Sequence, residues 1–181
     1  WDLNFSKNGT TIAIYKDLKQ IIVSSFLTTI NTKGIKMVEI SHINQLELFN
    51  SFSEKQRARL SEIIEATFYK KGDQVYQRGD RADKMFVVFE GSVSLTELEP
   101  GDEVGIVFEE RERGDFFGSA SFMEPKVYTL TAICQADTEV LAIDADQLFA
   151  LCQEDSVLGY KFMKKIAQIY FKRYKKTKRQ I

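Results

Sequence analysis

The stretch that decides the fold lies near the middle of the chain and reads YKKGDQVYQRGDRADKMFVVFEGSV, from residue 69 to residue 93. Gly72, Gly79 and Gly91 divide it into short runs that contain several β-branched and aromatic residues. Glycine adopts the positive φ values that tight turns require, so each of the three predicts a turn between two strands. Regularly spaced helical segments between these strands are missing. The pattern therefore predicts an antiparallel sandwich or barrel and not a parallel α/β sheet.

The same rhythm continues on both sides of this stretch. The predicted strands are residues 67–70, 74–77, 85–90, 92–98, 103–109, 127–133 and 139–143. Ahead of them, Ser53 and Gln56 have the spacing of a capping box, which marks the start of a helix. Leu60, Ile63 and Ile64 continue the apolar face of that helix.

Behind the strands the chain returns to helix. Residues 145–152 predict a short helix, and Asp155 or Ser156 can cap a longer one that runs to about Lys176. One apolar face of the long helix can cover the sandwich, and a second can meet another copy of the chain. The residues predicted for the dimer face are Leu158, Phe162, Ile166, Ile169 and Tyr170. The fold class is thus mainly β with flanking α: an antiparallel double-stranded β-helix or jelly roll with an N-terminal helix and C-terminal helices.

The composition excludes several classes of protein. The 181 residues are 44% hydrophobic, with 26 acidic and 25 basic residues and a net charge of −1, which favours a globular chain without general affinity for nucleic acid. No apolar run approaches ~18 residues, so no membrane span is predicted. His42 is the only histidine, and Cys134 and Cys152 are the only cysteines, which predicts no metal site and no enzyme activity. Two reduced thiols indicate a cytoplasmic protein.

Several motifs follow one another in an order typical of one known family. They are residues 69–76, 79–88, 90–93, 114–118 and 140–144. Together they resemble the cyclic-nucleotide-binding domain family, the β-roll that bacterial Crp/Fnr-type regulators share with eukaryotic kinase regulatory subunits. The resemblance covers about residues 42–181. It divides the chain into an N-terminal appendage or remnant of an upstream domain (1–41), a β-roll (42–153), and a C-terminal hinge and dimerisation-type helix (154–181).

The resemblance implies an altered binding site. Typical members of the family place a Glu after the Phe-Gly pair, for the ribose 2′-hydroxyl, and about nine residues later an Arg for the cyclic phosphate. Here Ser119 stands at the Glu position and Tyr128 at the Arg position. Lys126 is the alternative phosphate ligand, although a Lys lacks the planar fork of an Arg. The candidate pocket consists of Phe117, Gly118, Ser119, Ala120, Ser121, Lys126, Tyr128, Thr129 and Thr131.

These replacements resemble a bacterial subgroup of stand-alone β-roll proteins, in which Tyr-Thr-x-Thr-Ala, here residues 128–132, replaces the Arg segment. The predicted function is a non-enzymatic regulatory or sensory module that requires no cofactor and whose candidate ligand is a cyclic nucleotide or another small anion. The predicted partners are a second copy, through the long helix, and another protein. Residues 175–181 are too few for a DNA recognition helix with its support, so no sequence-specific DNA binding is expected. Two alternatives stay open: a structural dimerisation or docking domain without a ligand, and a true cyclic nucleotide binder that uses Lys126.

Overall fold

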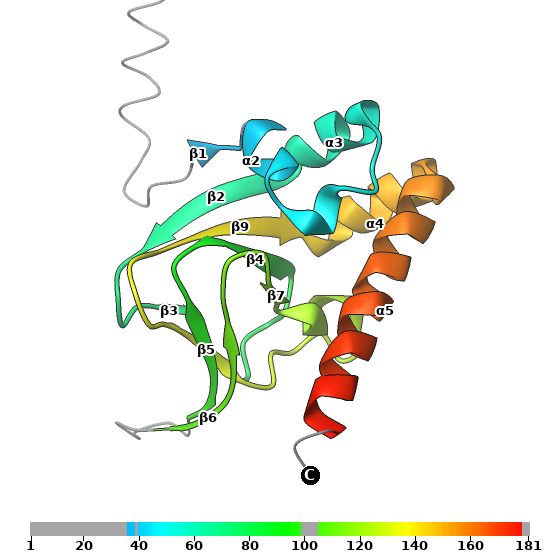
Figure 1. Ribbon diagram of the computed structural model, residues 1–181. Helices are drawn as coiled ribbons and strands as arrows, with labels where there is room; N and C mark the ends of the chain where they lie inside the picture. Colours follow the sequence, from blue (N-terminus) through cyan, green and yellow to red (C-terminus); the bar gives the residue numbers. More distant parts are fainter. Residues whose placement is uncertain (1–35, 39, 99–104, 179–181) are drawn as a thin grey trace, which may run out of the picture. The chain divides into compact units, whose positions relative to one another are not determined.

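A computed structural model of the protein describes residues 36–38, 40–98 and 105–178. Within these ranges the strands form two antiparallel sheets, one in the order β1-β2-β9-β4-β7 and the other in the order β3-β8-β5-β6 (Figure 1). The strands are β1 (Lys36–Met37), β2 (Ile64–Tyr69), β3 (Gln74–Tyr76), β4 (Lys84–Glu90), β5 (Val93–Glu97), β6 (Ile106–Arg111), β7 (Phe116–Phe117), β8 (Thr131–Cys134) and β9 (Thr138–Asp144). The two sheets enclose a roll, which confirms the predicted fold class. Most of the predicted appendage 1–41 lies outside the described residues.

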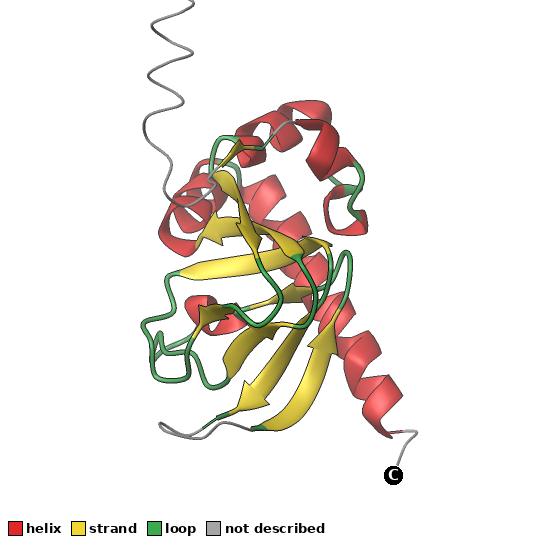
Figure 2. Cartoon of the chain, turned by 90° about the vertical axis from the view of Figure 1, so that its left-hand side faces the viewer, coloured by secondary structure: helices red, strands yellow, loops and turns green. Residues whose placement is uncertain are grey.

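Helices and short 3₁₀ turns flank the sheets (Figure 2). They are α2 (Ile40–Asn44), the 3₁₀ turn η1 (Glu47–Phe49), α3 (Glu54–Ser61), the 3₁₀ turn η2 (Ser119–Phe122), α4 (Ala145–Glu154) and α5 (Ser156–Lys178). None of the helices in the described ranges is both long and apolar enough to cross a membrane.

The capping box that starts α3 is confirmed. Ser53 Oγ accepts a hydrogen bond from the Gln56 backbone N–H at 3.2 Å, and Gln56 Oε1 accepts one from the Ser53 N–H at 3.1 Å. The helix is shorter than its apolar pattern predicted, because Ile64 already lies in β2 and pairs with Ile143 of β9. The prediction that Ile64 continues the helical face is therefore wrong: its burial comes from the sheet.

The five-stranded sheet separates two apolar clusters, since successive side chains of a strand point to opposite faces. On β4, Met85, Val87 and Phe89 pack against the helices. Phe86 and Val88, the residues between them, point into the roll. A strand that is buried on both faces reads as a continuous apolar run, as this one does.

The strands around the candidate site differ from the prediction in two places. Phe116–Phe117 forms β7, a short strand that the sequence did not indicate. Residues 127–130 precede β8 and pair with a turn: the Tyr128 N–H donates to Asp80 O at 3.0 Å, and the Gly79 N–H donates to Tyr128 O at 2.9 Å. The segment that carries Tyr128 therefore leaves the sheet and follows the loop between β3 and β4.

The long helix α5 begins where one of the two predicted caps lies, because Asp155 Oδ1 accepts a hydrogen bond from the Leu158 N–H at 2.9 Å. Leu158, Phe162 and Ile166 are buried in the core of this same chain, and Ile169 packs against that core. This corrects the predicted dimer face: these side chains attach α5 to its own domain. Tyr170, the last residue of that face, is 41% exposed.

Candidate functional site

Tyr128, one of the predicted pocket residues, points into the roll. Only 4% of this residue is exposed. Its hydroxyl donates a hydrogen bond to Lys84 O at 2.7 Å and accepts one from the Lys84 N–H at 3.3 Å. Burial raises the pKa of Tyr128 to about 12. The side chain is therefore a neutral group fixed at both its ring and its hydroxyl.

Other aromatic rings surround Tyr128 in the roll interior. The Tyr76 ring of β3 stacks on it, with ring centroids 3.7 Å apart and an interplanar angle of 12°. Tyr76 also lies 5.7 Å from the ring of Phe86 and 6.0 Å from that of Phe117, and the Phe86 and Phe117 centroids are 5.3 Å apart. Burial raises the pKa of Tyr76 well above its usual value. We call Tyr76, Phe86, Phe117 and Tyr128 the aromatic cluster.

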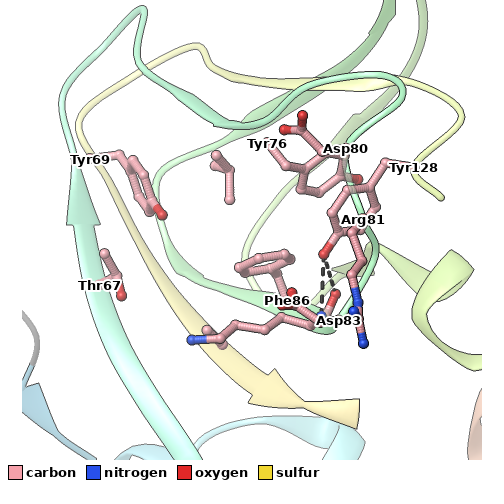
Figure 3. A pocket seen from close by; sticks show the side chains of 11 residues that line it. Thr67, Tyr69, Tyr76, Asp80, Arg81, Asp83, Phe86 and Tyr128 are labelled. Carbon is pink, nitrogen blue, oxygen red and sulfur yellow. Dashed lines mark hydrogen bonds between the residues drawn. The ribbon is translucent and has the colours of Figure 1, made fainter. Parts of the chain in front are cut away.

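A cavity of about 270 Å³ remains beside the aromatic cluster. Figure 3 shows Tyr69 and Thr67 on β2 at one side of it, and Tyr76, Asp80 and Tyr128 at the other. Its wall carries the cations Arg81 and Lys84 together with two carboxylates, but the Lys84 ammonium already binds Glu65 at 2.9 Å. The cavity thus offers aromatic surface and a rim of mixed charge.

The turn at Gly118 brings β7 close to β4. Gly118 has a φ of 76°, and a Cβ added there would lie 3.1 Å from both Lys84 O and Phe86 Cδ2. Gly118 and Phe117 are therefore fixed by the packing of the roll itself. The next residue, Ser119, was also predicted to line the pocket, and its hydroxyl hydrogen-bonds the hydroxyl of Tyr170 on α5.

The same turn holds the last part of α5. The Phe116 and Tyr170 rings meet edge to face, with centroids 5.5 Å apart. Arg173 donates to Phe116 O at 3.1 Å and to Asp115 Oδ1 at 3.2 Å, and its guanidinium lies over the Phe116 ring. The helix α5 therefore contacts the Phe-Gly turn through Tyr170 and Arg173.

The other predicted pocket residues do not converge with Tyr128. Lys126 extends outward and pairs with Asp146 of α4 at 2.8 Å, a contact that raises the pKa of Lys126. Thr131 is buried and accepts a hydrogen bond from the Arg78 N–H at 3.1 Å, whereas Thr129 is exposed. Ala120 is partly buried against the roll interior. Ser121 is buried, and its hydroxyl has no hydrogen-bond partner among the described residues.

The sequence analysis missed three residues that shape the site. Tyr76 and Phe86 face the interior because of their place in the strand alternation, a signal that was present in the sequence. Arg111 ends β6 opposite Val93 of β5, and its side chain is only 9% exposed. An Arg among exposed polar residues gives no sign of burial in the sequence; only the strand register reveals it.

The antiparallel roll encloses a cavity, and α5 contacts the roll at its Phe-Gly turn. Residues 66–155 match the model of the cyclic nucleotide-binding domain. The matched region therefore belongs to the cyclic nucleotide-binding domain family.

Solved structures of low sequence identity share the fold. A putative cyclic nucleotide-binding protein from Geobacter metallireducens is 21% identical with a TM-score of 0.67, and the match covers 76% of this chain and 99% of that one. The regulatory domain of Toxoplasma gondii PKA, crystallised with cAMP, is 18% identical with a TM-score of 0.57, and the match covers 71% and 48% of the two chains.

Curated relatives are much longer than the matched region. A cGMP-dependent protein kinase from Caenorhabditis briggsae is 25% identical over 113 residues, which are 62% of this chain and 15% of the kinase. A cAMP-dependent protein kinase regulatory subunit from Mycosarcoma maydis is 27% identical over 128 residues, 70% of this chain and 24% of the subunit. The chain therefore spans between about a seventh and a quarter of the length of these two relatives.

Proposed function

We propose that this chain is a non-enzymatic regulatory module whose roll does not bind cyclic AMP or cyclic GMP through the usual contacts. The observation that carries the proposal is the buried Tyr128 at the position of the phosphate-binding Arg. An anion placed in an apolar interior needs a cation or several donors, because its desolvation is costly. The Tyr128 hydroxyl already hydrogen-bonds the Lys84 backbone, and its ring stacks on the ring of Tyr76.

Lys126 does not substitute for the missing Arg in this arrangement. Its ammonium lies 2.8 Å from the Asp146 carboxylate on α4, away from the aromatic cluster. A lysine would have to leave this pair and turn toward the roll. The alternative of a true cyclic nucleotide binder that uses Lys126 is therefore disfavoured.

Calorimetry on the wild-type chain and three variants tests the proposal. We expect no saturable heat from cyclic AMP or cyclic GMP with the wild-type chain or with Lys126→Gln. We expect the double variant Ser119→Glu with Tyr128→Arg to gain binding, because it restores both side chains of the family's site. Ser119→Glu alone is the matched control, since it lacks the cation for the phosphate. Micromolar binding by the wild-type chain would overturn the proposal, and its loss in Lys126→Gln would establish the Lys126 alternative.

We also propose that the module forms a homodimer through the side of α5 that faces away from the core. The exposed apolar side chains on this side are Val157, Tyr160, Met163, Phe171 and Tyr174. They recur at intervals of three or four residues, apart from the eight between Met163 and Phe171, and so form one strip along the helix. Sedimentation should find a dimer that Tyr160→Lys with Met163→Lys converts to a monomer. A wild-type monomer at high micromolar concentration would contradict the dimer.

We propose that the module acts in the cytoplasm, since its two cysteines are free. Burial raises the pKa of both thiols, Cys134 and Cys152. A raised thiol pKa lowers the thiolate fraction and with it the reactivity of the cysteine. Neither thiol is therefore placed to act as a nucleophile, which agrees with a module that binds and does not catalyse.

A further inference from the structure

A larger cavity lies outside the roll, between α5 and the segment that links β6 to β7. This groove has a volume of about 770 Å³, nearly three times that of the cavity beside the aromatic cluster. Phe108, Arg111 and Asp115 lie along one wall, and Ile169 and Arg173 of α5 along the other. The groove is therefore bounded by the roll and by the helix that the Phe-Gly turn holds.

Arg111 is the unusual residue of this groove. Its side chain is 91% buried, yet it carries a charge, and its Nε–H has no hydrogen-bond partner among the described residues. The remaining guanidinium nitrogens bind the Glu109 carboxylate and Glu110 O. A buried charged donor without a partner is costly, so such a group is unusual unless something else binds it.

Two guanidinium groups lie close together in this groove. Burial, together with the nearby guanidinium of Arg173, lowers the pKa of Arg111 to about 10. The Glu109 carboxylate binds Arg111, and the Asp115 carboxylate binds Arg173 at 3.2 Å. The Nε–H of Arg111 is therefore the donor that these carboxylates leave without a partner among the described residues.

The α5 wall adds further positive charge. The helix has no acidic residue between Ser156 and Lys178. Lys165, Lys172 and Arg173 line the groove, and Lys165 is neutralised by Glu47 at 2.8 Å. The carboxylates that line the groove are Glu47 of η1 and, on the other wall, Glu109, Glu110, Glu112 and Asp115. The Glu109 side chain is half exposed. A carboxylate with that freedom can turn outward and leave Arg111 to another anion.

We propose that this groove, and not the roll interior, binds a small phosphate-bearing molecule, with its phosphate between Arg111 and Arg173. A phosphomonoester suits the chemistry, because guanidinium groups match phosphate oxygens and a dianion can replace the Glu109 carboxylate. The volume exceeds what a phosphate ion alone would fill, and Phe108 and Ile169 offer apolar surface to an organic body.

Such a ligand would connect β6 to α5. It would bind the helix beside the contacts that Tyr170 and Arg173 make with the Phe-Gly turn, and so favour the docked position of α5. This response of the helix rests on the proposed regulatory function. Binding in the groove does not, because it follows from Arg111 and its surroundings alone.

Titration calorimetry of the full chain in phosphate-free buffer, with phenyl phosphate and with inorganic phosphate as probes, tests the groove. We expect saturable binding of phenyl phosphate, weaker binding of inorganic phosphate, and affinity for phenyl phosphate about ten- to a hundredfold lower in Arg111→Gln. Arg59→Gln removes the same charge far from the groove and should bind as the wild type does. Arg173→Gln with Lys172→Gln alters only the α5 wall, so the test holds even where Arg111→Gln fails to fold.

The outcomes separate this inference from the proposed function. Absence of saturable phenyl phosphate binding, or equal affinity in the wild type and in both groove variants, would overturn the groove site alone. Binding of cyclic AMP that is unchanged in Arg111→Gln would overturn the proposed function alone, because the nucleotide would then lie in the roll.

Discussion

Replacing Tyr128 tests whether its ring is a structural part of the roll. Tyr128→Ala removes a nearly fully buried ring that stacks on Tyr76 at 3.7 Å and hydrogen-bonds the Lys84 backbone at 2.7 Å. Large-to-small substitutions of buried aromatic residues cost about 3–5 kcal/mol, which in a chain of this size lowers the Tm by roughly 6–20 °C. Tyr128→Phe keeps the ring and loses the hydroxyl, so it should cost about 1 kcal/mol.

Chemical denaturation monitored by circular dichroism measures both values. The matched control is Val127→Ala, since Val127 is the neighbouring residue and is 38% exposed. It should change the free energy of unfolding by less than about 1 kcal/mol. If Tyr128→Ala were as stable as Val127→Ala, the ring would not be a packed part of the interior, and the reasoning about the altered site would be refuted.

Three further predictions concern the frame around the site. Ser53→Ala should destabilise the chain by about 1 kcal/mol through loss of the α3 cap, whereas Ser156→Ala, at an exposed serine, should have little effect; equal effects would contradict the cap. Gly118→Ala should lower the free energy of unfolding by about 1–2 kcal/mol because of the positive φ, and by more because the added Cβ would lie 3.1 Å from Lys84 O. The loss should exceed that of Gly72→Ala, where φ is 91° and no atom lies within 4 Å of the added Cβ. The reverse order would refute the close packing at Gly118. The raised pKa of Tyr128, about 12 against about 10 in the unfolded chain, means that the unfolded state loses its phenolic proton first as the pH rises. The contribution of Tyr128 to stability should therefore be constant up to about pH 10 and fall between about pH 10 and 12, and Tyr128→Phe should reduce the slope measured by denaturation in that range.

Local signals predicted much of the fold. The capping box at Ser53, the glycine turns and the apolar run of β4 each rest on a few neighbouring residues, and the structure contains all three. Errors arose where tertiary pairing decides. Ile64 joins the sheet because it pairs with β9, and residues 127–130 leave the sheet because they pair with the turn at Gly79.

The candidate site was less predictable than the fold. Ser119 and Tyr128 could be located by motif spacing, but the direction of a side chain depends on what surrounds it. Lys126 faces Asp146 on α4, a residue 20 positions away. The burial of Arg111 and its place in the groove depend on the pairing of β6 with β5 and on the position of α5. Long-range partners of this kind leave no trace in the local sequence.

The same limit explains the corrected dimer face. A helix of 23 residues carries apolar residues on more than one side, and periodicity alone does not say which side meets the core. The structure assigns Leu158 and Phe162 to the core and leaves Tyr160 and Met163 exposed. Substitutions that test the dimer therefore belong at exposed residues such as Tyr160 and Met163.

A crystal structure of the chain grown with cyclic AMP tests the central claim most directly. The account predicts that the roll interior is unchanged, with Tyr128 stacked on Tyr76 and no nucleotide density between Gly118 and Tyr128. Density for a cyclic nucleotide in that place, with the Tyr128 ring displaced and its phosphate bound by Lys126 or another cation, would contradict it.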